Sequence, residues 1–108
     1  MNVGSVVIVH LKDPSEKYWG LVLRLDAMGV TVRGVNLESF EDWMQAVASE
    51  RDPDIGLATV FFPMLRIERI FLDEPAGVIE SLSQRFERRV GQGVMAFLQA
   101  EELGTQIM

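Results

Sequence analysis

The sequence of 108 residues contains no cysteine and only one histidine. Without cysteine there is no disulfide framework, no thiolate metal site and no cysteine nucleophile. The single imidazole, His10, lies in a strand-like segment with no second ligand type at metal-binding spacing nearby, so we expect no zinc site. We also expect no cofactor. The absence of cysteine is compatible with a cytoplasmic location.

Long apolar runs and N-terminal basic residues are missing too. The apolar runs fall far short of the roughly 18 residues that a membrane span requires. No basic residue precedes the first apolar segment, residues 6–9, which argues against a secretory signal. The formal net charge of −6 disfavours unspecific attraction to nucleic acid or anionic lipid. We therefore expect no membrane partner.

Groups that carry catalysis are not evident in the sequence. Nothing resembles a hydrolase nucleophile with its base. Carboxylates occur in pairs, such as Asp73 with Glu74, but these pairs lie at expected helix starts, turns and the C-terminal tail. Asp26 is expected to bond the backbone of its own turn. The sequence therefore does not predict an enzyme.

The residues that are present predict a single domain over residues 1–108, because a hydrophobic content of 48% suffices for a modest core. Residues 18–25 alternate with the period of a strand that has one face in a core. One face of this segment carries Trp19, Leu21, Leu23 and Leu25. Residues 26–29 predict a hairpin turn in which Gly29 supplies the positive φ. The next segment is the return strand.

Three further strands are expected, at residues 3–11, 57–62 and 67–72. Gly34 breaks the alternation of the return strand, and this predicts a bulge or sharp bend there. Pro63 cannot donate to a ladder and is expected at a strand end or an exposed edge.

Two helices are predicted by a change of period. Phe40, Trp43 and Met44 begin an apolar series with helical spacing, which predicts a helix over residues 39–49 with Ser39 as its cap. Apolar residues from Val78 to Phe97 fall within one arc of a second helix, which predicts a C-terminal amphipathic helix over residues 75–99.

Part of the sequence resembles the Sm-like small barrels. Residues 20–32, with Gly20 in the second strand and Asp26 before the hairpin turn, look like the first motif of that family. Residues 61–70 are similar to the last two strands of its bacterial RNA chaperone branch. The resemblance covers residues 3–37 and 57–72. It implies a five-stranded SH3-like barrel, here with one helix inserted between strands three and four and another at the C-terminus.

The resemblance also implies partners, although the family's RNA-contacting residues are replaced. Family members form rings by pairing the fourth strand of one copy with the fifth strand of the next. The asparagine of the family's hairpin turn is missing from Met28-Gly29. Pro63, Met64 and Leu65 stand where the chaperones carry Tyr-Lys-His. The ring-forming habit can therefore persist without the RNA site.

Basic residues beside aromatic ones support a second hypothesis, an RNA-binding protein of the chaperone type. The candidate nucleic-acid contacts are Lys12, Lys17, Tyr18, Arg66, Arg85 and Arg88. In the alternative interpretation the aromatic residues point into the core and the cations lie on solvated faces, paired with acidic residues. The net charge favours this alternative.

The last two predicted strands are unusually apolar. Strands of this kind are prone to aggregation unless another element or another copy of the chain covers them. The candidate oligomer interface consists of Phe61, Phe62, Met64, Leu65, Ile70 and Phe71. Alternatively, the C-terminal helix covers these residues. The first hypothesis for function is therefore a non-enzymatic small barrel, mainly β with two helices, that forms a homo-oligomer and serves as a binding or scaffold module.

Overall fold

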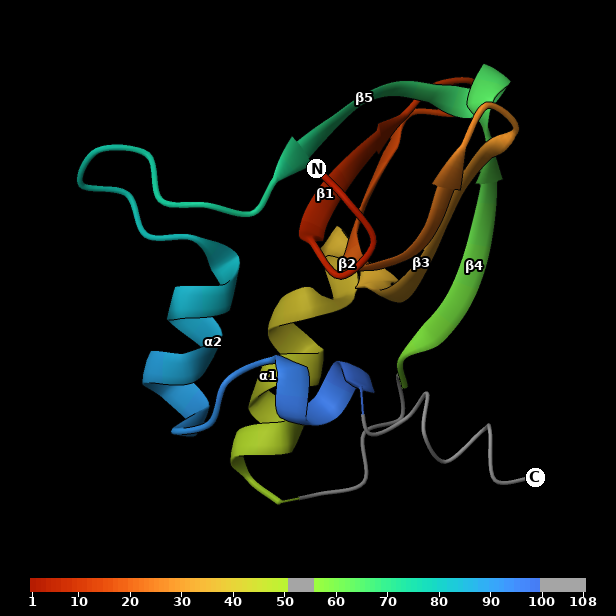
Figure 1. The fold of residues 1–108 in the computed structure, drawn as a ribbon. Coiled ribbons are helices and arrows are strands. Elements are labelled where there is room, and N and C mark those ends of the chain that lie inside the picture. Colours follow the sequence, from red (N-terminus) through yellow and green to blue (C-terminus); the bar gives the residue numbers. More distant parts are fainter. Residues whose placement is uncertain (51–55, 100–108) are drawn as a thin grey trace.

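The computed structural model of the protein describes residues 1–50 and 56–99. In this part of the chain one curved β-sheet lies against a helical layer (Figure 1). The strands are β1 (Val6–Leu11), β2 (Glu16–Asp26), β3 (Gly29–Asn36), β4 (Ala58–Pro63) and β5 (Ile67–Leu72). The helices are the 3-10 helix η1 (Leu37–Ser39), α1 (Phe40–Ala48), the 3-10 helix η2 (Met64–Arg66) and α2 (Leu82–Val90).

The sheet has five strands in the order β4-β3-β2-β1-β5, and every neighbouring pair is antiparallel. The prediction of a mainly β fold with five strands and additional helices is confirmed. The closed barrel is not observed, because β4 and β5 form no ladder with each other in the described residues. The two strands leave η2 in different directions, and β5 crosses over to β1 (Figure 1). Within residues 1–50 and 56–99 the sheet therefore has two unpaired edges, β4 and β5.

Of the bulge or sharp bend predicted at Gly34, the bulge lies in the neighbouring strand instead. Gly34 pairs directly with Gly20, whereas the register shifts between Val22 and Arg24 of β2. An extra residue in one strand of an antiparallel pair bends that strand and increases its twist. The bulge therefore contributes to the curvature of the sheet. The prediction that Gly29 supplies a positive φ at the hairpin is confirmed, because its φ is 157°. A Cβ at this position would also collide with the carbonyl oxygen of Phe62.

The inner face of the curved sheet forms its own core. Val9 on β1, Val32 on β3 and the other central valines of this face are fully buried. The buried members of this cluster are Val7, Val9, Leu11, Tyr18, Val22, Val30, Val32 and Phe62, with Val60, Ile67 and Ile70 packed against them. All five strands contribute, so the sheet curls around a common core although its edges do not pair.

The outer face of β1, β2 and β3 packs against the helices. Trp19 of β2 is fully buried and makes an edge-to-face contact with Phe40 of α1 at 4.9 Å between ring centroids. Trp43 of α1 stacks on Phe86 of α2 at 4.9 Å. Aromatic pairs in these geometries stabilise a core beyond their buried area. Trp19 and Leu21 therefore face the helices, as the period of β2 predicts, and Leu25 lies beyond the bulge and is exposed.

The first predicted helix is confirmed to within a residue at each end, as α1. Ser39 is its N-cap residue, as predicted, but the side chain of Ser39 makes no capping hydrogen bond. Instead, the side chain of Asn36 accepts a hydrogen bond from the backbone N–H of Glu38 and caps η1, which leads into α1.

The second predicted helix is wrong in extent, because α2 spans Leu82–Val90 and not residues 75–99. Ser81 and Gln84 form a reciprocal capping box at its start, and Gly91 ends it in the left-handed conformation with a φ of 90°. Before the helix, a tight turn at Gly77 is closed by two backbone hydrogen bonds between Ala76 and Ile79. Residues 95–99 are helical again. The strong caps at residues 81 and 91 override the apolar periodicity.

Within the described residues, no helix is both long enough and apolar enough to cross a membrane.

Candidate functional site

The six residues predicted as nucleic-acid contacts do not form one surface. Tyr18 is buried in the inner core, and its hydroxyl donates to the carbonyl oxygen of Gly34 at 3.1 Å. This corrects the prediction for Tyr18, because a buried ring cannot stack on a base. Burial raises its pKa, with Arg33 acting in the opposite direction. Lys12 and Lys17 are exposed at the opposite ends of the β1–β2 turn.

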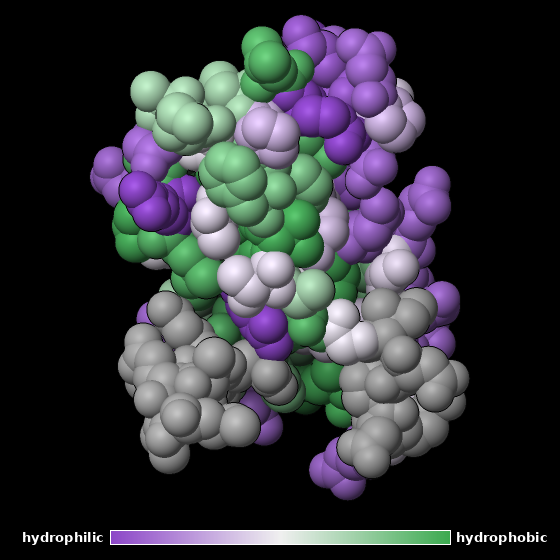
Figure 2. Space-filling model, turned by 90° about the vertical axis from the view of Figure 1, so that its right-hand side faces the viewer, coloured by the Kyte–Doolittle hydropathy of each residue, from purple (hydrophilic) through white to green (hydrophobic). Residues whose placement is uncertain are grey.

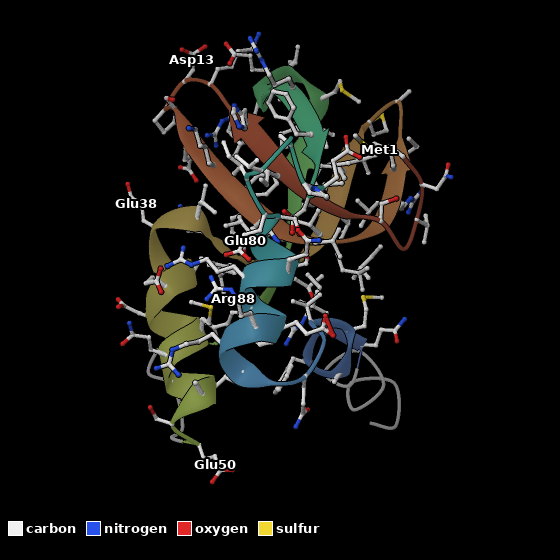
Figure 3. All side chains as sticks on the ribbon, turned by 90° about the vertical axis from the view of Figure 1, so that its left-hand side faces the viewer. Met1, Asp13, Glu38, Glu50, Glu80 and Arg88 are labelled. Atoms are coloured by element: carbon white, nitrogen blue, oxygen red, sulfur yellow. The ribbon has the colours of Figure 1, made fainter. Side chains whose placement is uncertain are left out.

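The three arginines of that set already have partners within the chain. The Arg66 guanidinium donates to the carbonyl oxygens of Lys12 and Pro14, each at 2.9 Å, and so fastens η2 to the β1–β2 turn. Arg85 of α2 pairs with Glu41 of α1. Arg88 pairs with Glu80, and Figure 3 shows the two side by side on the side of α2. The interpretation that these cations pair with acidic residues therefore fits the structure better.

The predicted interface residues divide between the core and the surface. Phe62 is buried in the inner cluster and Ile70 packs against it, so these two do not offer their side chains to another molecule. The other four are exposed: Phe61 by 52%, Met64 by 41%, Leu65 by 89% and Phe71 by 44%. The alternative that the C-terminal helix covers them does not hold for α2, because Phe86 of this helix packs on Trp43 of α1.

In the part of the chain that the structure describes, no strand pairs with the outer side of β4, and this edge strand carries no charge. The N–H of Met64 donates to the carbonyl oxygen of Met28 at 2.9 Å. Because antiparallel pairing alternates, the register of β3 with β4 turns the N–H groups of Thr59 and Phe61 away from β3. Pro63 ends the strand on this edge, as predicted. Figure 2 faces the side of the molecule that β4 occupies in Figure 1 and shows hydrophobic residues running through its centre.

The carboxylates serve local structure. The backbone N–H of Met28 and the guanidinium of Arg24 both donate to Asp26, and they lower its pKa in that order of importance. The prediction that Asp26 bonds its own turn is confirmed. Asp73 accepts hydrogen bonds from the backbone N–H groups of Leu82 and Ser83 at the start of α2, although the helix does not begin directly after it as the sequence predicted. The described residues contain no group of three or more potential metal ligands.

A row of three basic side chains crosses the outer face of the sheet, and sequence analysis missed it. Lys17 of β2 lies directly opposite His10 of β1, and His10 lies directly opposite Arg69 of β5. Directly opposite residues share one face of a sheet, with Cβ atoms about 5 Å apart. The ring of Phe71, two residues beyond Arg69, touches the His10 ring edge-on at 4.8 Å between centroids. Nothing in the sequence places residue 69 beside residue 10, because that depends on β5 crossing to β1.

A proton on His10 is disfavoured by its surroundings in the row. Partial burial lowers the pKa of His10, and the charges of Lys17 and Arg69 lower it further, with Glu68 acting in the opposite direction. Like charges directly opposite each other destabilise a sheet. The row is therefore a local concentration of positive charge on a chain whose net charge is negative.

We expect the single histidine to titrate below its ordinary pKa of 6.5. The unfolded chain then binds the proton more readily than the folded chain, so the free energy of unfolding falls as the pH drops from above 6.5 through the folded pKa. A proton NMR titration of the imidazole measures this midpoint without assignment ambiguity, since His10 is the only histidine. Lys17→Ala should move the midpoint upward, whereas Lys12→Ala, the matched control, should leave it in place. A wild-type midpoint at or above 6.5 would contradict this description of the row.

No protein-family model matches the sequence, and neither the curated proteins nor the solved structures searched contain a match.

Proposed function

We propose that the protein is a non-enzymatic binding or scaffold module of the Sm-like kind, and that it assembles with copies of itself through the β4 edge. The observation that carries this proposal is an edge strand that is open, exposed and uncharged. The five antiparallel strands, with Gly20 in β2 and Asp26 at its end before the β2–β3 turn, support the Sm-like resemblance.

The two edges differ in how they are protected. Charged side chains on an edge strand discourage pairing with a strand that carries no complementary charge. β5 carries Glu68 and Arg69 in its middle, whereas β4 reads Ala-Thr-Val-Phe-Phe-Pro and carries no charge. Exposed Met64 and Leu65 of η2 extend the apolar surface of β4 at one end. This contrast favours pairing of β4 with β4 of a second copy about a two-fold axis, the commonest symmetry of homo-oligomers.

The RNA-binding alternative is not favoured in the form that the sequence suggested. Tyr18 is buried, and Arg66, Arg85 and Arg88 are held by partners within the chain. The net charge of −6 opposes a general attraction to RNA.

Light scattering coupled to gel filtration tests the assembly. We expect a mass of two chains, where one chain weighs 12.2 kDa, and dissociation on dilution. Phe61→Lys places a charge on the β4 edge and should give the mass of one chain. Val78→Lys, the control, also replaces an apolar side chain with lysine, at a fully exposed loop position, and should leave the dimer intact. Leu72→Lys, on the β5 edge, should also leave it intact.

Hydrogen exchange gives a second measurement that needs no variant. In the dimer the outward-facing amides of Thr59 and Phe61 should be protected, and that protection should fade on dilution. A wild-type mass of one chain at all concentrations would overturn self-assembly. If both Leu72→Lys and Phe61→Lys dissociated the assembly, the copies would pair head to tail, β4 with β5, and not about a two-fold axis.

A further inference from the structure

Within the described residues, the outer edge of β5 has unpaired backbone groups with which an added strand could form hydrogen bonds. The backbone N–H of Asp73 donates to the carbonyl oxygen of Val6 at 2.9 Å, which continues the β1–β5 register by one pair. Because the antiparallel ladder alternates, the N–H and carbonyl groups of Ile70 and Leu72 face away from β1. In the described residues no strand lies on that side. An extended peptide would satisfy these groups with main-chain hydrogen bonds.

The side chains at this edge specify which peptide fits. The basic row runs from Lys17 through His10 and ends at Arg69, whose side chain is 59% exposed. A residue of an added strand directly opposite Arg69 would be the fourth member of this row, about 5 Å away. A carboxylate at that position would pair with Arg69 and would offset the repulsion that a protonated His10 meets from Lys17 and Arg69. Glu68 acts against this repulsion at His10, and it lies 3.8 Å from Arg69 in an exposed pair.

Phe71 is the second residue that determines which peptide fits this edge. Its ring is 44% exposed, and the guanidinium carbon of Arg69 lies over it at 5.9 Å from the centroid. The position opposite Phe71 in an added strand lies on the same face as the position opposite Arg69, two residues along. A β-branched or aromatic side chain there would make a favourable cross-strand pair with Phe71.

We propose that the β5 edge binds an acidic segment of a partner protein as a sixth strand, with a carboxylate opposite Arg69 and a β-branched or aromatic residue opposite Phe71. The occupant is a peptide and not a nucleic acid, because the free backbone groups of Ile70 and Leu72 match a strand. This site does not depend on the β4 interface, since all of its residues belong to one chain and to the opposite edge of the sheet.

Fluorescence anisotropy with designed peptides tests the site. The probe is a short labelled peptide built mainly of threonine and valine. It contains a single glutamate, and one residue separates this glutamate from the valine that is meant to face Phe71. We expect it to bind the full chain, and Arg69→Glu should weaken binding at least about tenfold, as charge reversal at a complementary contact does. A second peptide with lysine in place of the glutamate should bind the Arg69→Glu variant better than the wild type. Arg24→Glu makes the same exchange at an exposed position on β2, and this variant should bind the peptide like the wild type.

Two further probes decide between strand addition and general attraction of anions. A glutamate peptide with N-methylated backbone amides should not bind, because it cannot donate to the carbonyl groups of the edge. The midpoint of the His10 titration should rise when the glutamate peptide is bound and stay in place when valine replaces the glutamate. The proposal would be overturned if the glutamate peptide did not bind, or if its N-methylated form bound equally well. It would also be overturned if Arg24→Glu weakened binding as much as Arg69→Glu. Finally, it would be overturned if a single-stranded RNA bound more tightly than the peptide and Arg69→Glu abolished that binding. None of these results bears on the mass of the Phe61→Lys variant, so this proposal and self-assembly fail separately.

Discussion

Gly34→Ala should destabilise the protein by about 3 kcal/mol or more, since forcing extra atoms into a packed site costs this much when the backbone itself must move. Gly34 of β3 faces Gly20 of β2, and a Cβ on Gly34 would collide with the carbonyl oxygen of Trp19 and lie 2.6 Å from the Cα of Gly20. Backbone atoms cannot rotate away as a side chain can, so the two central strands would have to separate. The carbonyl of Gly34 also accepts the buried hydrogen bond from Tyr18.

Urea unfolding followed by tryptophan fluorescence measures this loss, and the melting temperature should fall by about 12–24 °C. Gly56→Ala is the matched control, because a Cβ at Gly56 meets nothing within 4 Å and its φ is not left-handed. It should change stability by no more than about 0.5 kcal/mol. Equal unfolding midpoints for the two variants would show that β2 and β3 do not approach as closely as described.

Features that depend on residues close together in the chain are predicted well from the sequence. The period of β2 places Trp19 on one face, and helical spacing from Phe40 to Val47 predicts α1 to within a residue. Asp26 bonds its own turn because the partner is two residues away. These features depend on local sterics and on the contrast between apolar and polar faces, both of which are visible in the sequence.

The errors arise where two local signals compete. From Val78 onward the apolar spacing suits a helix, yet Val78 is fully exposed in a loop. The capping box of Ser81 with Gln84 starts α2 later, and the turn at Gly77 takes up the preceding residues. Capping satisfies N–H groups that apolar periodicity does not account for, and so it sets the helix boundary.

The open edges and the basic row could not be predicted for a different reason. Both depend on which strands pair, and the pairing of β1 with β5 joins segments about sixty residues apart. His10 and Arg69 are unremarkable in their own segments and become a site only through that register. Sequence analysis correctly identified the apolar character of β4, but only the structure separates exposed Phe61 from buried Phe62.

The second large effect is expected at the junction between the sheet and the helices. Asp73→Ala should cost about 2–4 kcal/mol, because it removes a helix cap and leaves a buried indole N–H without its acceptor. The Asp73 carboxylate accepts hydrogen bonds from the indole of Trp19 at 3.1 Å and from the backbone N–H groups of Leu82 and Ser83 at 2.8 Å each. It also accepts one from the Ser83 hydroxyl at 2.6 Å. One side chain at the end of β5 thus fixes both the fully buried Trp19 and the start of α2.

Urea unfolding measures the loss, and two NMR signals locate it. In Asp73→Ala the indole N–H resonance of Trp19 should shift and the amide of Ser83 should exchange faster. Asp73→Asn keeps one acceptor oxygen and should recover part of the stability. Glu74→Ala is the matched control, since Glu74 is the exposed neighbour and its loss should change stability by no more than about 0.5 kcal/mol. If Asp73→Ala and Glu74→Ala were equally stable, packing of Phe86 on Trp43 alone would hold α2 in place, and the carboxylate would not join the two layers.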